Sequence, residues 1–279
     1  MVNDQMVHGL IFAAGLGTRL KPLTDTMPKA LVPLAGKSLL QWQVEKLRDA
    51  GITDIVVNVH HFPDMIMDAI RANKGWGCNI SVSDERDMLL DTGGGLRKAK
   101  DLLMSNVQCP MSNESPILAC NVDILSNIDL CALLRAYDPN TLGTLVVSDR
   151  QTQRYLLFDE QNNLRGWTNI ATGEVRPESI SNLQSPISNY RKLAFSGMQI
   201  LSPRIFEHMN EVVAEKGDKF SLIDLYLSIC EESLSPLLKA YVPENYKMMD
   251  VGKIDEIKKA EQFAALLLCP PRGSKIARQ

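Results

Sequence analysis

Long apolar runs are missing from this sequence of 279 residues. A membrane-spanning helix needs roughly 20 consecutive apolar residues, and no run approaches that length. The N-terminus, where Asp4 and His8 precede a short apolar stretch, also lacks the charged-then-apolar pattern and the cleavage site of a signal peptide. We therefore expect a cytoplasmic protein with no membrane partner.

Surplus positive charge is also missing. The chain has 30 Lys and Arg residues against 33 Asp and Glu residues, a formal net charge of −3. Such a balance disfavours the broad basic surface that holds a nucleic acid or an anionic membrane. An anionic partner must therefore bind at a local site.

The six cysteines form no Cys-x-x-Cys pair and have no histidine at zinc-ligand spacing. This pattern excludes a zinc motif and predicts reduced residues of the core. They are Cys78, Cys109, Cys120, Cys131, Cys230 and Cys269.

What the sequence does contain, in its first half, is an alternation of short apolar segments with segments of helical periodicity. Apolar and β-branched residues predict strands at 10–14, 54–59, 78–83 and 117–120. Helical spacing predicts helices at 39–50, begun by Ser38 and stopped by Gly51, at 62–73, after Gly95 and from Asp129. This alternation is typical of an α/β fold, here a Rossmann-like, mixed and mostly parallel sheet flanked by helices.

The second half is richer in strands. Segments 143–148, 154–158, 164–169 and 193–200 predict strands, and the turn 161–163 joins two of them in a β-hairpin. The Ser- and Pro-rich stretch 171–192 predicts a mobile loop or lid. Helices after Pro203 and Phe220, short strands near 237–242 and 246–249, and a closing helix over 252–268 follow. We interpret residues 1–279 as one domain with halves at 1–130 and 131–279.

A glycine-rich loop follows the first strand, as Gly15-Leu16-Gly17-Thr18-Arg19-Leu20. Leu20 stands where the dinucleotide fingerprint requires a third glycine, which argues against a dehydrogenase. Gly36-Lys37-Ser38 resembles the end of a P-loop, but Leu31 occupies the place of its first glycine.

The loop that follows the first strand fits neither fingerprint, but it combines small residues with two cations. Together these residues predict a cradle for a triphosphate. Small residues allow the backbone to approach phosphates closely, and cations meet phosphate oxygens. The alternative is a tight turn with solvated charges. The residues of this loop that we expect at the nucleotide are Ala13, Ala14, Gly15, Gly17, Thr18, Arg19 and, after Pro28, Lys29.

On these motifs the sequence resembles the sugar-1-phosphate nucleotidyltransferases, whose signature has small residues, Gly-x-Gly-Thr-Arg and then Pro-Lys. The resemblance spans nearly the whole chain, through Thr92-Gly93-Gly94-Gly95, Asn121-Val122-Asp123, Phe195-Ser196-Gly197 and Met249-Asp250-Val251-Gly252. It implies that Arg19 and Lys29 are catalytic and neutralise phosphate charge. It also implies that Asp123 and Asp250 hold Mg²⁺, which suits two hard oxygen ligands. Alone, each aspartate is equally typical of a helix cap or a turn.

The resemblance further implies how the substrates are recognised. Thr92, Gly93, Gly94 and Asn121 are expected at the nucleotide, with Thr92 as the N-cap of a helix and the glycine N–H groups facing the ligand. Asn169, Ser196 and Gly197 are expected at the sugar. Val122 departs from the family, which usually has glycine there. His60 and His61 are interpreted as hydrogen-bonding loop residues, because no third metal ligand or nucleophile accompanies them.

The Asp-Thr-Gly-Gly-Gly form is closest to the branch with N-acetylmuramate 1-phosphate uridylyltransferases, while mannose-1-phosphate guanylyltransferases have a related loop. We therefore expect an enzyme that forms an NDP-sugar and pyrophosphate from UTP and N-acetylmuramate 1-phosphate, as a monomer or small homo-oligomer. The alternative within the class is a GTP-dependent mannose or heptose 1-phosphate guanylyltransferase. A nucleotide-sugar-binding regulatory protein without activity is the alternative from another class; it has no need of both carboxylates and both cations.

Overall fold

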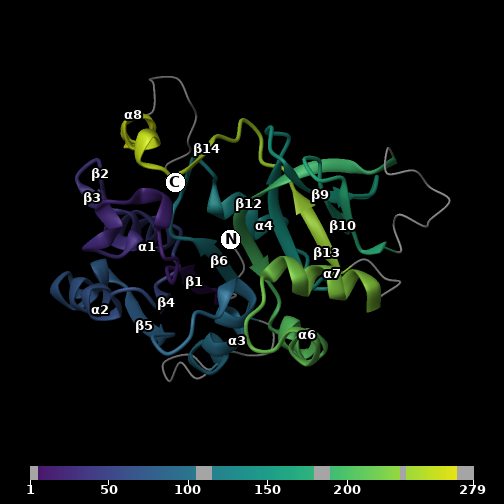
Figure 1. Cartoon of the computed structure of the whole chain (residues 1–279), viewed down its shortest axis with the longest axis horizontal. Coiled ribbons are helices and arrows are strands. Elements are labelled where there is room, and N and C mark those ends of the chain that lie inside the picture. The colour runs from purple at the N-terminus through teal and green to yellow at the C-terminus, as the bar shows by residue number, and fades with distance from the viewer. Residues whose placement is uncertain (1–5, 105–114, 179–188, 233–236, 269–279) are drawn as a thin grey trace.

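The computed structural model describes residues 6–104, 115–178, 189–232 and 237–268 (Figure 1). Its strands are β1 (His8–Phe12), β2 (Pro33–Leu34), β3 (Lys37–Ser38), β4 (Asp54–Val59), β5 (Asn79–Asp84), β6 (Ile117–Asn121), β7 (Ile124–Ser126), β8 (Gly143–Ser148), β9 (Arg154–Phe158), β10 (Leu164–Asn169), β11 (Glu174–Arg176), β12 (Arg191–Leu201), β13 (Leu238–Tyr241) and β14 (Met248–Asp250). Its α-helices are α1 (Leu39–Asp49), α2 (Pro63–Ala72), α3 (Asp91–Met104), α4 (Leu130–Ala136), α6 (Met209–Lys216), α7 (Leu222–Glu232) and α8 (Ile257–Leu268).

A central sheet runs in the order β11-β10-β9-β12-β6-β1-β4-β5, with β8 and β13 added beside β12. Strands β6, β1, β4 and β5 pair in parallel, and β13 pairs in parallel with β8. The antiparallel pairs of this sheet all involve β12 or the hairpin strands β9 and β10. The expected Rossmann-like class, a mixed and mostly parallel sheet flanked by helices, is confirmed.

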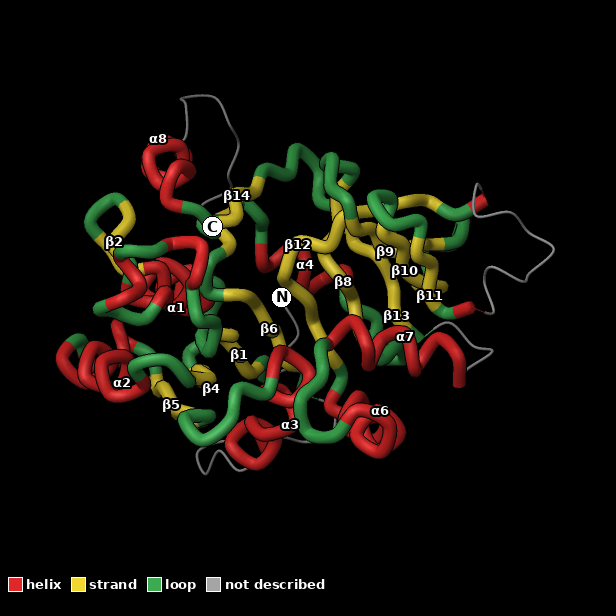
Figure 2. The backbone as a smooth tube through the Cα atoms, viewed as in Figure 1, coloured by secondary structure: helices red, strands yellow, loops and turns green. Residues whose placement is uncertain are grey.

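Two apolar cores lie on the two faces of this sheet, because neighbouring residues of a strand point to opposite sides. Leu10 and Phe12 of β1 pack on one face with α3, α6 and α7, while Ile11 packs on the other with α1, α2, α4 and α8. Figure 2 shows α3, α6 and α7 along one side of the sheet. Each large apolar side chain buried in this way contributes roughly 1.5–3 kcal/mol.

The residues predicted to begin and to end helix α1 have these roles in the structure. The Ser38 hydroxyl accepts a hydrogen bond from the Gln41 N–H at 3.1 Å, which is the capping contact that begins a helix. Gly51, just after the helix, has a φ of +85°, a conformation that favours glycine.

The first strand is shifted by two residues toward the N-terminus, from the expected 10–14 to His8–Phe12. It ends at Phe12 and not at Ala14, since the Ala13 N–H donates to the side chain of Asn58 at 2.7 Å instead of continuing the ladder. The loop after it contains three short 3₁₀ turns, at Thr18–Leu20, Leu23–Asp25 and Lys29–Leu31.

The expected mobile loop or lid over 171–192 is wrong at both of its ends, since its last two residues, Arg191 and Lys192, belong to β12. Residues Glu174–Arg176 form β11, which pairs with β10 and adds a third strand to the hairpin. The Arg176 guanidinium lies 4.5 Å from the centre of the Trp167 ring, a cation–π contact that holds β11 on the sheet. The serine- and proline-rich centre of that stretch, 179–188, lies outside the described residues.

The interpretation of the cysteines as core residues is confirmed fully for Cys120 alone among those that the structure describes, because the other three are partly exposed. Cys78, Cys120, Cys131 and Cys230 are free thiols, and Cys120 is fully buried. Cys109 and Cys269 lie outside the described residues. No helix in the described ranges is both long and apolar enough to cross a membrane.

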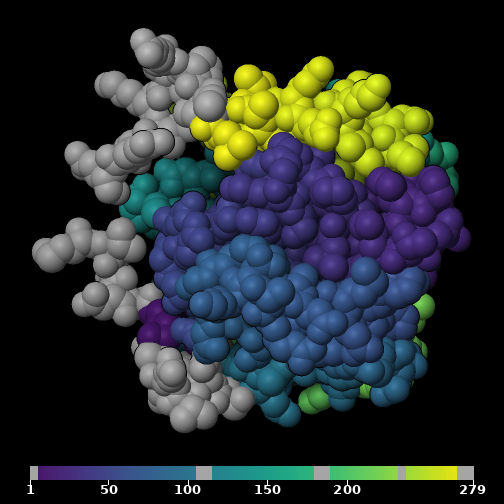
Figure 3. Space-filling view, turned by 90° about the vertical axis from the view of Figure 1, so that its left-hand side faces the viewer, coloured from purple at the N-terminus to yellow at the C-terminus, as the bar shows by residue number. Residues whose placement is uncertain are grey.

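The C-terminal helix lies on the N-terminal part of the chain. Ala260 and Ala264 of α8 are buried in the same core as Ile11, and the space-filling view shows the C-terminal residues over the N-terminal ones (Figure 3). This return of the chain carries β14, which precedes α8, to the strand β7. The two ends of the sequence thereby contribute to one site.

Candidate active site

The site lies at the carboxyl edge of the parallel strands. Phe12, the last residue of β1, is level with Asn58 on one neighbouring strand and with Asn121 on the other. The residues that follow these strand ends therefore meet at one edge, where α/β sheets bind ligands.

Gly17 shapes the glycine loop. It has a φ of +65°, and a Cβ there would lie 2.8 Å from Cγ2 of Thr24 and 3.0 Å from Cβ of Lys29. The Thr24 hydroxyl donates to the Gly17 carbonyl at 2.8 Å, and so does the N–H of the fully buried Leu20. These contacts hold the loop against the segment that carries Lys29 and leave Gly15, Thr18 and Arg19 exposed.

The two predicted metal ligands come together through β7 and β14. Asp123 immediately precedes β7, and Asp250 ends β14 opposite Ile124. The Val251 N–H donates to the Asp123 carbonyl at 2.8 Å. Partial burial of its carboxyl, together with the negative charge of Asp123, raises the pKa of Asp250 above its usual range. Two carboxyls far apart in sequence thus share one place.

Both predicted cations reach this pair of carboxylates. Lys29 is 8% exposed, and its ammonium forms an ion pair with Asp123. At Gly252, a Cβ would lie 2.8 Å from Oδ1 of Asp250 and 2.9 Å from Nη2 of Arg19. Arg19 and Asp250 therefore flank a glycine that leaves them room. The four charged residues predicted from four separate motifs form one cluster.

The donor set at this cluster fits Mg²⁺. Two carboxylates supply hard oxygen ligands, and after partial burial the negative charge of Asp123 is a further cause that raises the pKa of Asp250. Over the described ranges, no group of three or more His, Cys, Asp or Glu side chains is placed to hold a metal. A metal here would take its remaining ligands from water and substrate phosphates, which is the usual arrangement for Mg²⁺.

Helix α1 supports the strand that follows Asp123. Gln43 is buried and its amide donates to the Ile124 carbonyl at 2.6 Å. The Lys46 ammonium donates to the Ser126 carbonyl at 2.7 Å and to its hydroxyl at 2.8 Å. These contacts from α1 hold the first and the last residue of β7 in place. Gln43 and Lys46 are not predicted from the sequence, because both belong to an ordinary amphipathic helix pattern.

The burial of Lys46 predicts a pH-dependent stability. Burial lowers the pKa of the Lys46 ammonium to about 8, whereas lysine in an unfolded chain titrates near 10.4. Between these values the unfolded chain binds a proton that the folded chain does not, so this group makes the free energy of unfolding rise with pH. Below pH 8 the contribution is constant.

We expect urea denaturation of wild type and Lys46→Met at pH 7.5 and 9.5 to show this rise as a difference between the two proteins. Lys259→Met, at an exposed lysine of α8, should parallel wild type. An equal pH dependence in wild type and Lys46→Met would contradict the prediction.

The Thr-Gly-Gly-Gly segment differs from its prediction. Helix α3 begins at Asp91, so Thr92 lies inside its first turn and is not the N-cap. The Thr92 hydroxyl instead accepts from the Leu222 N–H at 3.0 Å, at the start of α7. The N–H groups of Gly93 and Gly94 both donate to the Phe220 carbonyl, at 2.9 and 3.1 Å. The nucleotide role of Thr92, Gly93 and Gly94 stays a prediction, and these two N–H groups already have a partner.

The predicted sugar residues lie toward the second half of the sheet. Ser196 is 1% exposed, and Gly197 has a φ of +69° with the amide of Asn121 close against it. A predicted sugar residue and a predicted nucleotide residue thus adjoin. Asn169 ends β10, and its side-chain carbonyl oxygen accepts from the Ala171 N–H at 3.1 Å in a local turn. The sugar roles themselves stay predictions.

The two histidines form loop hydrogen bonds, as interpreted. Nδ1 of His60 lies 2.7 Å from the Glu85 carbonyl, and Nε2 of His61 lies 3.4 Å from the Thr24 carbonyl. Sequence reasoning missed Asn58 and Glu85, which are buried between the loops of the site. The available signal was an amide within the apolar run Ile55-Val56-Val57-Asn58-Val59.

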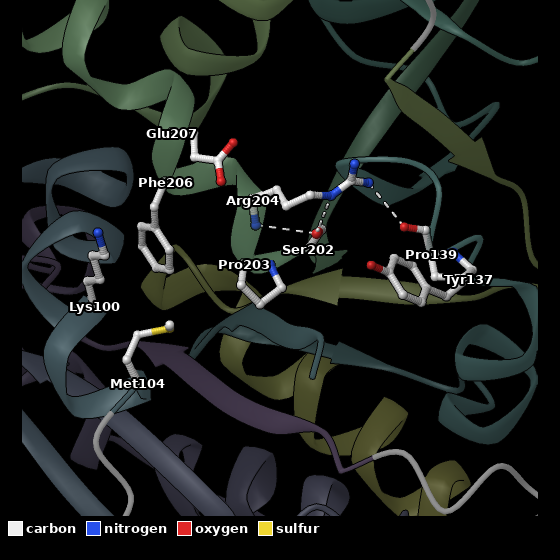
Figure 4. Close-up of a pocket in the computed structure, with 9 residues that line it drawn as sticks. All are labelled: Lys100, Met104, Tyr137, Pro139, Ser202, Pro203, Arg204, Phe206 and Glu207. Atoms are coloured by element: carbon white, nitrogen blue, oxygen red, sulfur yellow. Dashed lines mark hydrogen bonds between the residues drawn. The ribbon is translucent and has the colours of Figure 1, made fainter. Parts of the chain in front are cut away.

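A cavity of about 640 Å³ lies at the other end of the sheet (Figure 4). One of its lining residues, Ser202, follows the end of β12 that pairs with Ile117, where β6 begins, whereas Asp123 follows the far end of β6. Arg204 in this cavity is held by the Ser202 hydroxyl at 3.3 Å and the Pro139 carbonyl at 3.1 Å. This cavity is therefore separate from the charged cluster.

Comparison with known proteins bears on the cluster. The family described as nucleotidyl transferase matches residues 8–159. N-acetylmuramate alpha-1-phosphate uridylyltransferase of Neisseria meningitidis is 28% identical over 267 residues, which are 92% of this chain and 98% of that protein. The protein of the same name from Caulobacter vibrioides is 36% identical over 150 residues, 52% of this chain and 58% of that protein.

Mannose-1-phosphate guanyltransferase of Schizosaccharomyces pombe is 37% identical over 146 residues, 51% of this chain and 38% of that protein. Among solved structures, the inositol-1-phosphate CTP transferase of T. maritima superposes with a TM-score of 0.70 at 14% identity, covering 96% of this chain and 98% of that one. The structural likeness concerns the fold. The family match includes the segment that carries the glycine loop, Lys29 and Asp123.

Proposed function

We propose that this chain, which belongs to the nucleotidyl transferase family, transfers a uridylyl group from UTP to N-acetylmuramate 1-phosphate. The observation that carries the proposal is the meeting of Arg19, Lys29, Asp123 and Asp250 beside the glycine loop. The match to the Neisseria meningitidis uridylyltransferase supports the substrates, because it extends over 92% of this chain.

The reaction is a displacement at the α-phosphorus. An oxygen of the sugar phosphate attacks that phosphorus, the bond to the bridging oxygen of the β-phosphate breaks, and pyrophosphate leaves with the electron pair. Phosphoryl transfer of this kind depends on positioning and on charge stabilisation more than on proton transfer. A site of two cations and two metal-binding carboxylates suits that demand.

The residues of the chain have distinct parts in this proposal. The backbone from Ala13 to Thr18 follows the triphosphate, with Asn121 at the nucleotide, and Arg19 stabilises charge on the leaving phosphates. Lys29, whose ammonium lies beside Asp123, would neutralise charge on a phosphate oxygen. Mg²⁺ bound by Asp123 and Asp250 would polarise the phosphorus and neutralise developing charge. Asn169, Ser196 and Gly197 lie at the sugar in this proposal.

A second candidate is GTP-dependent transfer to mannose or heptose 1-phosphate. It is favoured by the 37% identity with the Schizosaccharomyces pombe guanyltransferase over about half of this chain. That alignment covers 38% of the relative's length, so it bears on only part of either protein.

A substrate grid tests both candidates. Pyrophosphate release is measured with Mg²⁺ for UTP, GTP, CTP, dTTP and ATP against the 1-phosphates of N-acetylmuramate, N-acetylglucosamine, glucose, mannose and heptose. We expect one strong pair, UTP with N-acetylmuramate 1-phosphate. A strong pair of GTP with mannose or heptose 1-phosphate would favour the second candidate. Tight binding of a nucleotide sugar without pyrophosphate release from any pair would identify a regulatory protein.

A further inference from the structure

A chain of buried hydrogen bonds connects the glycine loop to the start of α3. The Ala13 N–H donates to Oδ1 of Asn58 at 2.7 Å, and Nδ2 of Asn58 donates to Oε1 of Glu85 at 2.7 Å. The second carboxylate oxygen, Oε2 of Glu85, accepts from the Leu90 N–H at 3.2 Å. The donors and acceptors thus come from the ends of β1 and β4 and from the segment between β5 and α3.

This network consists of buried polar groups, and such groups cost free energy unless each has a hydrogen-bond partner. Asn58 is 2% exposed and Glu85 is not exposed at all. Burial raises the pKa of the Glu85 carboxyl. The hydrogen bonds from Asn58 and Leu90 act in the opposite direction and offset part of this rise. Buried polar groups of this kind favour one arrangement of their neighbours, since a lost partner leaves an unsatisfied group behind.

The network has a direction that constrains both loops. The Ala13 N–H requires an acceptor and therefore holds Oδ1 of Asn58, so the amide nitrogen must face Glu85. Glu85, with two acceptor oxygens, keeps that orientation and also holds Leu90, one residue before α3. At Gly95 a Cβ would lie 2.7 Å from Nδ2 of Asn58 and 2.9 Å from Oε1 of Glu85. Gly95 therefore lets α3 approach the network.

We infer that Asn58 and Glu85 are positioning residues, which fix the glycine loop relative to the start of α3 and thereby set how the nucleotide binds. Both side chains are buried, so both act through the backbone of Ala13 and Leu90. The inference rests on the proposed function, because it assigns the two loops to one nucleotide.

Exchanging acid and amide tests the inference with nearly isosteric variants. Asn58→Asp places two carboxylates against each other, and Glu85→Gln leaves one acceptor for the two donors, the Asn58 amide and the Leu90 N–H. The double variant Asn58→Asp with Glu85→Gln restores every contact. In it the new carboxylate accepts from the Ala13 N–H and from the new amide, whose oxygen accepts from the Leu90 N–H.

We expect each single variant to raise the KM for the nucleoside triphosphate about tenfold, the usual effect of one lost charged hydrogen bond. The KM for the sugar 1-phosphate should stay within about twofold, and the double variant should recover most of the loss. The control is Asn163→Asp, in the turn between β9 and β10. Its buried amide likewise donates to a carboxylate, that of Asp159, at 3.0 Å. It should lose stability without a change in the triphosphate KM.

The outcomes separate this inference from the proposed function. A wild-type protein that releases no pyrophosphate in any pair would contradict the proposed function itself. An active wild type whose single variants keep the triphosphate KM would overturn the inference. Equal rises of both KM values, or a double variant no better than the single ones, would also overturn it, because they would indicate general loss of structure.

Discussion

Asp250→Asn is expected to lower turnover by roughly 10³-fold or more while leaving the protein at least as stable as wild type. In the proposed function the carboxylate is a metal ligand, whereas partial burial and the negative charge of Asp123 raise the pKa of Asp250 and disfavour its charged form. Replacing it by a neutral amide removes that repulsion in the folded state. Activity and stability therefore change independently.

Asp123→Asn is expected to lose turnover by a similar factor and to lose stability as well. Its carboxylate is the partner of the nearly buried Lys29 ammonium, which would lose its closest anion. Pyrophosphate release at saturating Mg²⁺ and urea denaturation measure the two effects.

The matched control for both variants is Asp64→Asn, which removes an exposed carboxylate paired with Arg86 and should leave turnover and stability near wild type. Wild-type turnover in either Asp123→Asn or Asp250→Asn would remove that residue from the metal site.

Gly94→Ala is expected to lower the free energy of unfolding by about 3 kcal/mol, at the upper end of the usual cost of overpacking. A Cβ at Gly94 would lie 2.2 Å from the Asp218 carbonyl oxygen, and this backbone atom cannot rotate away as a side chain can. Relief requires α3 to move from the segment around Phe220, which accepts the N–H groups of both Gly93 and Gly94.

Urea denaturation of Gly94→Ala beside Gly15→Ala checks this. A Cβ at Gly15 has no heavy atom within 4 Å, so that variant should stay within about 0.5 kcal/mol of wild type. Equal stability of the two variants would show that the close approach of α3 to Asp218 has no energetic weight.

The two glycine segments differ in how well their sequence patterns predict the structure. The residue types of the first, Gly15 to Leu20, predict a loop that cradles a triphosphate; the structure has a close-packed loop there, and its role at the triphosphate stays a prediction. The pattern of the second, Gly93 to Gly95, predicts N–H groups that face a ligand. Its glycines instead lie against four residues that all belong to other parts of the chain than α3. These residues are Phe220, Asp218, Asn58 and Glu85. A glycine pattern indicates close approach but does not identify what approaches.

The sequence by itself determined the fold class and most elements, because short-range periodicity and caps such as Ser38 act within a few residues of each other. Motif context likewise indicated Arg19, Lys29, Asp123 and Asp250. Only the tertiary structure decided that β14 pairs with β7 and so unites the two aspartates, and that Asn58 and Glu85 connect the loops. Such contacts join residues that are 27 to 127 positions apart in the sequence. Local periodicity describes only neighbouring residues and therefore does not predict which distant residues come into contact.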